Sequence, residues 1–430
     1  MRVVIVGAGF AGFQAARTVC RDDPDIEVVV VNPTDYFLYV PLLPEVAAGV
    51  LDPRRVLIPI PATLPGVRLA LGTVHGVDLE ERAVRYVDPE GRHHELGYDR
   101  LVLAAGSVSK LLPVPGITDH AHGFRGVPEA LYLRDHLTRQ VELAAAADDP
   151  AERDARCTFV VVGAGYTGTE VAAHGPGLTA ALAQRHPGLA EQPMRWMLLD
   201  VAERVLPELD RRLGKTADRV LRSRGVDVRM GTSIEEATAD GVTLTTGEKV
   251  PARTLVWCVG VRPDPLVSEL GLPTDRGRLA VDASLRVPGR PDVFACGDAA
   301  AVPNAAKPGE ITPMTAQHAV RQGKLAGRNV VASVRGRPMK AYRHHDLGFA
   351  VDLGPGHAAA NPLRIPVSGF PAKLLTRGYH LLSMPANRVR TTVDWALDTL
   401  TTRQTVQLGL VRSGAVPLDT ASPELPAQRP

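Results

Sequence analysis

The amino-acid sequence predicts an α/β fold built from two similar modules and a C-terminal α/β region with amphipathic helices. The main observation is a repeated pattern. A strand-like run of branched apolar residues leads into a turn with glycines at its first, third and sixth positions, and a helix follows. The pattern occurs at 2–12 and again at 158–168. One copy is weak evidence, whereas two copies in the same setting predict two Rossmann-like dinucleotide-binding domains.

Length and composition set the frame for this prediction. A chain of 430 residues is long enough for two or three domains, and 45% hydrophobic with 22% charged residues is typical of a globular protein. The net charge of +2 gives no reason to expect nucleic acid as a partner. The four cysteines are far apart and form neither a CxxC pair nor a disulfide framework, which favours an intracellular protein.

The chain has no sequence signal for crossing a membrane. No apolar run approaches the ~18 to 20 residues that span a bilayer. The first residues lead directly into a strand-like run and lack the layout of a signal peptide. Any contact with a membrane is therefore expected to be peripheral.

The two glycine-rich turns are the predicted phosphate sites. In such a turn the first glycine permits a tight bend, the second lets the backbone approach a pyrophosphate, and the third lets helix and strand pack closely. The expected residues are Gly7, Gly9 and Gly12 in the first module and Gly163, Gly165 and Gly168 in the second. The strands that close the modules end in small residues, Ala105, Gly106 and Gly260, which we include among the cofactor-binding residues.

A polar residue after the next strand is expected to bind the adenosine ribose. In the second module this is Asp200, whose carboxylate accepts both ribose hydroxyls and repels a 2′-phosphate, which favours NADH over NADPH. The segment 178–193 makes the gap from Gly168 longer than the usual ~20 residues, so an ordinary surface aspartate is the alternative. In the first module Asn32 stands at this position, and its amide oxygen accepts a hydroxyl less strongly than a carboxylate would.

A third segment indicates which nucleotide belongs to which module. Residues 291–300 read as a strand that ends in Gly297-Asp298 and opens a helix. They resemble the second flavin fingerprint of two-dinucleotide-binding flavoproteins, which implies that Asp298 binds the ribityl chain. An ordinary helix N-cap is the alternative for Asp298. The sequence therefore assigns FAD to the first module and NADH to the second.

From Arg2 to about Leu410 the sequence resembles type II NADH dehydrogenases, the single-subunit NADH:quinone oxidoreductases that pump no protons. Four segments carry the resemblance: 35–49, the TGxE pattern in 162–172, the AQxAxQQG-like pattern in 312–323, and the region from Gly369 on. It implies hydride transfer from NADH to FAD and two-electron reduction of a membrane quinone, menaquinone or ubiquinone. Val40 and Arg321 stand where the family usually has Gln.

The resemblance also implies the catalytic residues. It places Glu170 near the nicotinamide and flavin rings, where Glu170 either caps local N–H groups or contributes charge and a proton. A helix is expected to open near Ala316-Gln317 and to direct its N-terminus at the flavin, which stabilises the anionic reduced ring. Gln317 also lines the acceptor pocket. Arg321 donates hydrogen bonds to a quinone carbonyl or favours a more polar or anionic acceptor.

The histidines are interpreted as structural. His318, beside Gln317, is expected to be a satisfied helix residue rather than a proton relay. His93-His94 and the segment 344–346 lack the spacing of a metal site and are expected to be surface or turn residues, so no metal is predicted.

The region 370–412 is locally basic and amphipathic. Apolar residues fall on one face of each of two predicted helices: Leu374, Leu375, Tyr379 and Leu382, then Val389, Val393, Ala396, Leu397 and Leu400. The basic residues are Lys373, Arg377, Arg388, Arg390, Arg403 and Arg412, against two acids. Such helices lie in a bilayer interface with basic residues near anionic headgroups, or pack on the enzyme body or a second subunit. The family resemblance favours peripheral attachment to the cytoplasmic side of the cell membrane.

These observations define the expected domains. The FAD-binding domain comprises 1–115 and 286–330, a connecting helix region 116–154, and the NADH-binding domain 155–285. A membrane-facing or dimerisation region at 331–415 and a frayed tail at 416–430 complete the chain.

Two alternatives to the quinone reductase remain. Val40 and Arg321 leave open a related NAD(P)H-dependent flavin reductase that passes electrons to a soluble carrier or another small oxidant. A redox-sensing binding protein is disfavoured, because two complete dinucleotide sites imply transfer between them. Disulfide reductases and sulfide:quinone reductases are excluded, since 38–45 contains no cysteine.

Overall fold

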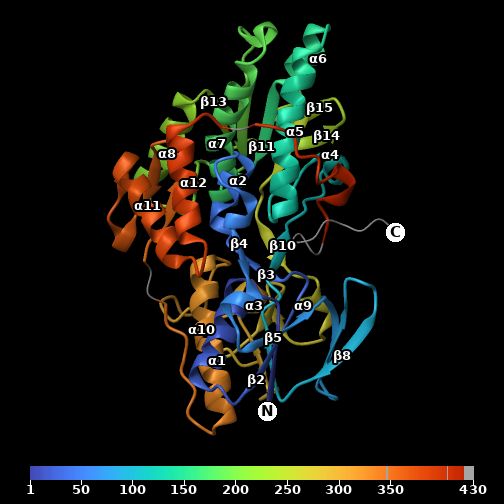
Figure 1. Cartoon of the computed structure of the whole chain (residues 1–430), viewed down its shortest axis with the longest axis vertical. Helices are drawn as coiled ribbons and strands as arrows, with labels where there is room; N and C mark the ends of the chain where they lie inside the picture. Colours follow the sequence, from blue (N-terminus) through green and yellow to red (C-terminus); the bar gives the residue numbers. More distant parts are fainter. Residues whose placement is uncertain (345–346, 404, 421–430) are drawn as a thin grey trace. The chain divides into compact units, whose positions relative to one another are not determined.

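The computed structural model describes residues 1–344, 347–403 and 405–420 (Figure 1). The chain forms two compact units, each assembled from three segments. Unit 1 comprises Met1–Tyr39, Leu57–Val108 and Val261–His345, and unit 2 comprises Val40–Val56, Ser109–Gly260 and Asp346–Pro430. Each unit contains its own parallel sheet, so the predicted pair of Rossmann-like modules is confirmed.

The central sheet of unit 1 is parallel and five-stranded, in the order β21-β9-β1-β2-β5. Its strands are β1 (Arg2–Val6), β2 (Glu27–Asn32), β5 (Val67–Leu71), β9 (Arg100–Leu103) and β21 (Val293–Ala295). The central strand β1 is almost completely buried, as the unbroken apolar run at 3–6 predicts. The carboxyl ends of β1 and β2 lie at one edge, which brings the first glycine turn and Asn32 together.

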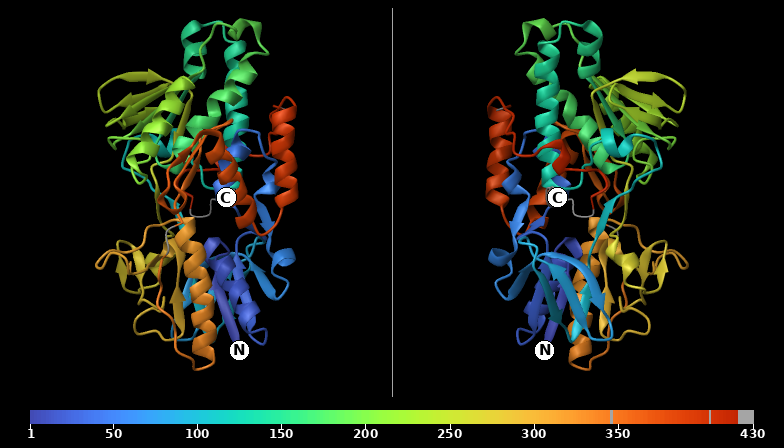
Figure 2. Two further views of the ribbon diagram at one scale, coloured as in Figure 1. Left: turned by 90° about the vertical axis from the view of Figure 1, so that its left-hand side faces the viewer. Right: turned by 90° about the vertical axis from the view of Figure 1, so that its right-hand side faces the viewer.

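Two long helices pack on each other in unit 1. They are α1 (Phe10–Asp22) and α10 (Ala316–Val334), side by side in Figure 1 and in both views of Figure 2. Two glycines of α10 allow the close approach: a Cβ at Gly323 would lie 2.1 Å from the carbonyl oxygen of Ala11, and one at Gly327 2.8 Å from that of Ala15. This packing fixes the start of α10 relative to the first glycine turn.

The remaining elements of unit 1 are short. An antiparallel sheet consists of β6 (Thr73–Asp78), β7 (Ala83–Val87) and β8 (His93–Gly97). The others are β3 (Tyr36–Leu38), β4 (Leu57–Pro59), α3 (Ile60–Thr63), β18 (Val261–Pro263), α9 (Leu266–Glu269), β19 (Thr274–Asp275), β20 (Arg278–Ala280) and β22 (Ala300–Ala301). Strand β20 pairs with β22, which ties 261–285 to unit 1 although we expected these residues in the second domain.

Unit 2 has a four-stranded parallel sheet in the order β13-β12-β11-β17. Its strands are β11 (Thr158–Val162), β12 (Arg195–Asp200), β13 (Val226–Met230) and β17 (Thr254–Trp257). The long helices of this part are α5 (Val127–Ala145), α7 (Tyr166–Ala183) and α8 (Arg211–Ser223). Shorter elements are α4 (Ile117–His120), α6 (Pro150–Arg156), β14 (Ile234–Thr238), β15 (Gly241–Leu244) and β16 (Lys249–Pro251). Strand β10 (Ser107–Ser109) begins in unit 1 and ends at the first residue of this segment of unit 2.

Two distant segments complete unit 2. One is α2 (Leu43–Ala47), and the other is the C-terminal region with β23 (Ala350–Asp352), β24 (Ala358–Ala360), β25 (Val367–Ser368), α11 (Gly369–Ser383) and α12 (Arg388–Leu400). Both α2 and β23 contact α7. The C-terminal region therefore shares a unit with the second module instead of forming a third body.

The end of the described chain is packed rather than frayed. Val416 and Leu418 are buried, and Leu418 joins a hydrophobic cluster that includes Ile117 and Trp257 of unit 2. The expected frayed tail is therefore wrong for 416–420, because two apolar side chains anchor it. Residues 421–430 lie outside the described part of the chain.

Candidate functional site

The first glycine turn has the shape of a phosphate cradle. Gly7 has a φ of +89°, and a Cβ there would lie 2.5 Å from the carbonyl oxygen of Ala104. A Cβ on Gly12 would lie 1.8 Å from the carbonyl oxygen of Gly7. A Cβ on Gly9 would meet nothing within 4 Å. The fold thus requires glycine at the first and third positions of the turn. The second position borders open space at the start of α1, and a helix N-terminus is a favourable place for an anion.

The second turn repeats this geometry in unit 2. Gly163 has a φ of +106°, and a Cβ on Gly168 would lie 1.9 Å from its carbonyl oxygen. A Cβ on Gly165 again meets nothing within 4 Å. The chain therefore has two cradles with the same division of roles among their glycines.

The last residue of each second strand, Asn32 of β2 and Asp200 of β12, accepts a hydrogen bond from its glycine turn. Strand register places Val6 beside Val31 and Val162 beside Leu199, so Asn32 and Asp200 fall next to the two turns. The amide of Ala8 donates to Asn32 Oδ1 at 2.8 Å, and that of Ala164 donates to Asp200 Oδ2 at 2.5 Å.

Asp200 is therefore part of the cradle and not an ordinary surface residue. The long gap that precedes it has a structural cause, because α7 continues to Ala183 and a 3₁₀ turn, Pro187–Leu189, follows before β12 begins. The gap lengthens the connection without displacing Asp200 from the end of its strand.

The Gly297-Asp298 segment differs from the expectation in one respect. It forms a 3₁₀ turn, Gly297–Ala299, that leads into the short strand β22, so the predicted helix is wrong. Asp298 is consequently not a helix N-cap. The hydroxyl of Ser107 donates to Asp298 Oδ2 at 2.6 Å, which fixes this carboxylate at the end of the sheet beside β9.

Two buried residues that the sequence analysis missed hold this turn. Gln322 of α10 accepts a hydrogen bond from the amide of Gly297 at 2.8 Å and donates to Thr312 Oγ1 at 2.9 Å. Arg278 donates to the carbonyl oxygens of Asp298 at 3.1 Å and Thr312 at 2.6 Å. Gln322 stands in the AQxAxQQG-like motif, so the motif did carry a signal for it.

Helix α10 begins at Ala316, as predicted, with Thr315 as its N-cap. The guanidinium of Arg321 donates to Gln317 Oε1 at 2.6 Å, and its Nη1 lies 3.2 Å from His344 Nδ1. The structure therefore brings two of the predicted catalytic residues into direct contact, with the positive charge of Arg321 beside the amide of Gln317.

The histidines next to this pair are packed together. His318 is buried and lies 2.8 Å from the hydroxyl of Tyr342, which confirms a satisfied helix histidine. His344 is partly exposed and lies outside any helix or strand, and its ring stacks on that of His318 with 4.0 Å between ring centroids. The rest of that motif, 345–346, lies outside the described residues.

The closing residues of the two modules also correspond. Gly106 and Gly260 both have positive φ, +79° and +100°, and follow Ala105 and Val259 after strands β9 and β17. The carbonyl oxygen of Gly106 accepts from the amide of Asp264 at 3.2 Å, and that of Gly260 accepts from the amide of Lys110 at 3.0 Å.

Glu170, the third predicted catalytic residue, lies on the first turns of α7. Its Oε1 accepts the backbone amide of Asp352 at 3.0 Å, so it caps strand β23 rather than its own helix. Burial raises the pKa of Glu170 well above its usual value. Glu170 therefore favours the neutral carboxylic acid in this environment.

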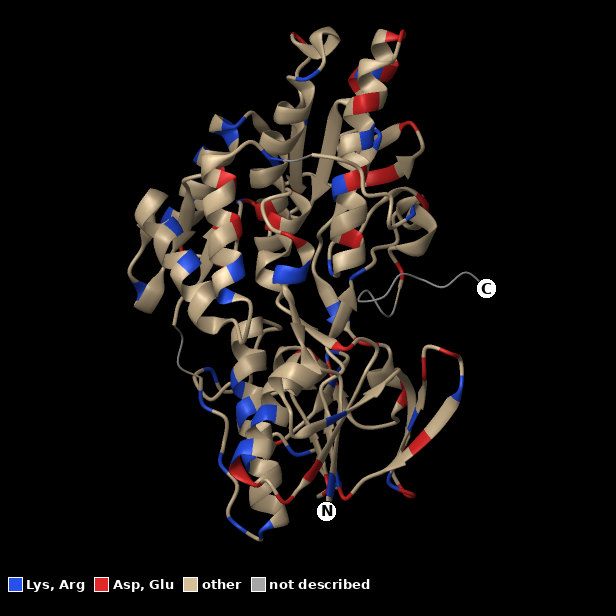
Figure 3. Cartoon of the chain, in the orientation of Figure 1, with Lys and Arg blue, Asp and Glu red and all other residues tan. Residues whose placement is uncertain are grey.

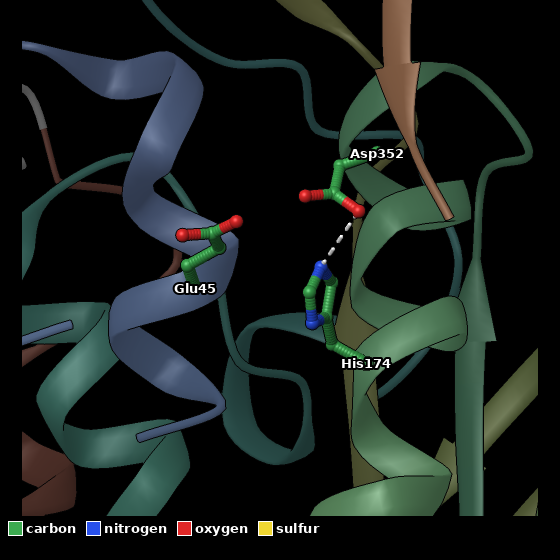
Figure 4. A group of neighbouring side chains, drawn as sticks. All are labelled: Glu45, His174 and Asp352. Atoms are coloured by element: carbon green, nitrogen blue, oxygen red, sulfur yellow. Dashed lines mark ion pairs between the residues drawn. The ribbon is translucent and has the colours of Figure 1, made fainter. Parts of the chain in front are cut away.

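Four buried ionisable residues lie beside Glu170. We call Glu45, His174, Asp352 and Lys373 the buried carboxyl cluster; three of them are labelled in Figure 4. The ammonium of Lys373 donates to Asp352 and lies 3.7 Å from Glu45 Oε1. His174 Nε2 lies 3.5 Å from Asp352 Oδ1, the ion pair dashed in Figure 4.

The two carboxyl groups of this cluster have opposite pKa shifts. Burial and the negative charge of Asp352 raise the pKa of Glu45 to about 8. Burial also acts to raise the pKa of Asp352, but the positive charge of Lys373 in contact with it opposes burial, and that pKa lies below its usual range. One carboxyl group is thus neutral near pH 7 and the other ionised.

Lys373 lies in a different environment from the one that the sequence predicts. It was expected near lipid headgroups, yet it is only 4% exposed. Glu45, His174 and Asp352 have side chains of the types that bind metals, with ligand atoms within 4.8 Å of one another. Because the Lys373 ammonium already bonds to Asp352 and lies 3.7 Å from Glu45, we assign no metal to the cluster.

Helices α11 and α12 expose their apolar residues. The buried residues of α11 are Ala372, Lys373, Thr376 and His380, and those of α12 are Thr391 and Trp395. The exposed apolar residues are Phe370, Leu374, Leu375, Tyr379, Leu382, Val389, Val393, Leu397 and Leu400. Packing on the enzyme body is thus wrong for these side chains. Figure 3 shows basic residues along both helices, and Arg388, Arg390 and Arg412 are exposed.

None of the helices within the described residues combines the length and the hydropathy that crossing a bilayer requires.

Comparisons with known proteins agree with this geometry. The family model described as pyridine nucleotide-disulphide oxidoreductase matches residues 1–323. A type II NADH:quinone oxidoreductase of Mycobacterium tuberculosis is 30% identical, over 94% of this chain and 89% of its own. A demethylphylloquinone reductase of Synechocystis is 30% identical, over 91% and 94%. The solved structure of NDH2 from Plasmodium falciparum in complex with NADH has a TM-score of 0.82 at 16% identity, over 94% and 99%.

Proposed function

Because the chain belongs to the pyridine nucleotide-disulphide oxidoreductases and, among them, to the type II NADH:quinone oxidoreductases, we propose that it transfers a hydride from NADH to FAD and passes two electrons to a quinone. The proposal includes no proton pumping. The observation that carries it is the pair of matching cradles, each with a polar side chain from the second strand bound to its turn.

The first cradle fits FAD. The backbone at Gly9 leaves room for a pyrophosphate at the start of α1, and Asn32 lies beside the turn to meet the adenosine ribose. Asp298, held by Ser107, is positioned for the hydroxyls of the ribityl chain. When bound, FAD supplies the ring system that accepts a hydride, which no protein side chain can do.

The second cradle fits NADH. Gly165 leaves the space for the pyrophosphate, and Asp200 supplies the carboxylate for the ribose hydroxyls. The same negative charge repels a 2′-phosphate, so NADPH is the poorer substrate. Glu170 follows this turn on α7, where a neutral acid meets the nicotinamide without placing a second negative charge there.

Gln317 and Arg321 act on the acceptor side. The charge of Arg321, bonded to Gln317 Oε1, is suited to hydrogen bonding with a quinone carbonyl and to stabilising negative charge that develops on it. We propose a membrane quinone of the menaquinone or ubiquinone class as the acceptor. The naphthoquinone named for the Synechocystis relative supports the first of these.

The deciding experiment uses the purified FAD-containing protein without oxygen. NADH is expected to bleach the visible flavin absorbance, and a short-chain menaquinone or ubiquinone analogue to restore it. If a confirmed FAD stays oxidised with NADH, the donor assignment is wrong. If soluble carriers or small oxidants restore the colour much faster than either quinone, the alternative flavin reductase is correct.

We further propose that α11 and α12 attach the protein to the cytoplasmic side of the cell membrane. Their exposed apolar faces, with Leu382 80% and Leu400 81% exposed, suit the acyl boundary of a bilayer. Arg388 and Arg390 are exposed beside them, where anionic headgroups attract basic side chains.

A liposome flotation assay tests this attachment. The variant Leu382→Glu with Leu400→Glu is expected to lose binding to anionic vesicles, while Leu143→Glu, at an exposed position of α5, is expected to keep it. If the double variant floats like the wild type, membrane attachment through these helices is wrong. If it instead converts a dimer into a monomer, the faces serve a second copy of the chain.

A further inference from the structure

The buried carboxyl cluster joins four elements of unit 2 that are far apart in the sequence. Glu45 comes from α2, His174 from α7, Asp352 from β23 and Lys373 from α11. All four side chains are buried, with Glu45 only 2% exposed. Figure 4 shows the side chains of Glu45 and His174 both directed towards that of Asp352.

The charges of this cluster do not balance when all its acids are ionised. Glu45, Asp352 and the neighbouring Glu170 are three carboxyl groups, and Lys373 is the one ammonium in contact with them among the described residues. An unpaired buried carboxylate costs several kcal/mol, so such a group takes up a proton instead. Lys373 bonds directly to Asp352, which makes Asp352 the ionised partner.

The other groups that face the cluster do not change this balance. Trp395 of α12 donates its indole N–H to Glu45, which satisfies one oxygen but adds no charge. His380 of α11 and His174 of α7 are buried, and desolvation lowers the pKa of both, which favours neutral rings. Arg403 contributes only a distant positive charge to His174 and is paired with Asp398. Arg224 of α8 contributes a positive charge near Asp352 without contacting it, because its guanidinium donates to the carbonyl oxygens of Ala173 and Pro355. The charge of Arg224 favours the ionised form of Asp352 over that of Glu45. Glu45 is therefore the group that carries the proton.

We propose that Glu45 and Asp352 form a carboxyl pair that stores one exchangeable proton, with Lys373 as its counter-ion and His174 as its link to Glu170. This inference rests on the proposed function and adds a proton source to it. Two carboxyl groups that share a site hold one proton between them, because both cannot ionise at such short range. A carboxyl oxygen of Glu45 lies within 4.8 Å of one of Asp352, which places the two acids in one site. The negative charge of Asp352 accordingly raises the pKa of Glu45.

His174 is placed to carry the proton onward. It lies one helical turn after Glu170 on α7, and both of its ring nitrogens are buried with no hydrogen-bond partner among the described residues. Its Nε2 lies 3.5 Å from Asp352. A neutral imidazole accepts a proton at one nitrogen and releases the other, so it can connect two acids.

Reduction of a quinone requires a proton that NADH does not supply. A quinone takes up two electrons and two protons to become a quinol, and NADH supplies two electrons with one proton as hydride. The second proton comes ultimately from solvent, and a protein acid that solvent reloads can supply it at once. When Glu45 releases its proton, the carboxylate that forms lies 3.7 Å from the Lys373 ammonium, which offsets part of its charge until solvent restores the proton.

The infrared difference spectrum of the FAD-containing protein, NADH-reduced and then reoxidised by a menaquinone analogue, tests the store directly. A protonated-carboxyl band that shifts in D2O is expected in the wild type and is expected to be absent in Glu45→Gln. The absence of any such band in the wild type, or its loss in Glu170→Gln alone, overturns the proposal. The wild-type spectrum decides even if Glu45→Gln fails to fold.

Rapid kinetics provide the second test. Glu45→Gln is expected to leave flavin reduction by NADH unchanged but to slow reoxidation by the quinone at least about tenfold at neutral pH. The wild-type quinone step is expected to decline above about pH 8. This decline moves to higher pH in Lys373→Met, because loss of the ammonium raises carboxyl pKa values, and stays in place in Lys373→Arg.

The controls separate this inference from the proposed function. Glu142→Gln changes an exposed carboxylate of α5 and is expected to behave as the wild type in both steps. If NADH does not reduce the wild-type flavin, the proposed function itself fails. If reduction is normal and Glu45→Gln keeps the wild-type rate and pH profile of quinone reduction, the proton store alone is wrong.

Discussion

The two cradles predict opposite outcomes for alanine at neighbouring glycines of one turn. Gly165 has a φ of −72° and a ψ of −166°, which alanine adopts without strain, and its added methyl would meet no atom within 4 Å. Gly168 lies three residues further on, inside α7, and a methyl there would lie 1.9 Å from the carbonyl oxygen of Gly163. Gly165→Ala should therefore spare the fold and Gly168→Ala should not.

The magnitudes follow from these distances. In Gly165→Ala the unfolded chain loses flexibility, which leaves stability unchanged or raises it by up to about 1 kcal/mol. The methyl displaces a pyrophosphate from the amides of the turn, and one charged hydrogen bond contributes roughly 1.5–3 kcal/mol. The KM for NADH is thus expected to rise about 10- to 100-fold. In Gly168→Ala overpacking costs about 1–3 kcal/mol or more.

The assay combines thermal unfolding, FAD content and initial rates with a quinone analogue. Gly165→Ala is expected to match the wild type in melting temperature and FAD content and to differ in KM for NADH. Gly168→Ala is expected to melt several degrees lower. A Gly165→Ala protein with a wild-type KM would falsify the assignment of the open space to NADH, and a lowered melting temperature for it would refute the packing argument.

Three further variants test other parts of the site. Asp200→Ser removes the negative charge beside the second turn and should raise the ratio of kcat/KM for NADPH over NADH about tenfold or more, measured by initial rates with both nucleotides. Gln322→Leu leaves the buried amide of Gly297 without its acceptor and should lower stability by about 1–3 kcal/mol, together with FAD retention on gel filtration; retention equal to the wild type would contradict this. Lys373→Met should lower the free energy of unfolding by roughly 3–5 kcal/mol near pH 7, against little change for the exposed Lys340→Met in denaturant titrations. The pKa of Asp352 is lower in the folded than in the unfolded protein. The ion pair therefore stabilises the fold fully above the unfolded pKa of about 3.9, and this stabilisation is lost as the pH falls towards the folded pKa. If Lys373→Met lowers the free energy of unfolding by as much in acid as at pH 7, the pairing of Lys373 with Asp352 is wrong.

The local parts of the site were predictable from the sequence. Each cradle is a short segment whose glycines, strand and helix follow in order, so Gly7 to Gly12 and Gly163 to Gly168 carry their own signal. Asp200 was predictable despite the long gap, because it ends the next strand, and parallel register places that end beside the turn. The start of α10 at Ala316 was indicated by its motif.

The buried carboxyl cluster was not predictable in the same way. Its members come from segments up to several hundred residues apart, and nothing in the sequence near Asp352 names Lys373 or His174 as a partner. The spacing of apolar residues identified one apolar face on each of the two C-terminal helices, but this spacing does not determine which face of a helix packs against the protein. On α11 the inward face is the polar one, so Lys373 was assigned to the wrong environment.

The interlaced course of the chain limits how the second module can be studied. Residues 109–260, cut out as a separate fragment, would retain the glycine cradle, Glu170 and His174. The fragment would leave behind α2, β23 and α11, and with them Glu45, Asp352 and Lys373. Glu170 and His174 would then meet solvent and titrate as they do in short peptides. Such an isolated domain could bind nucleotide and still misreport the acid–base behaviour of the intact enzyme.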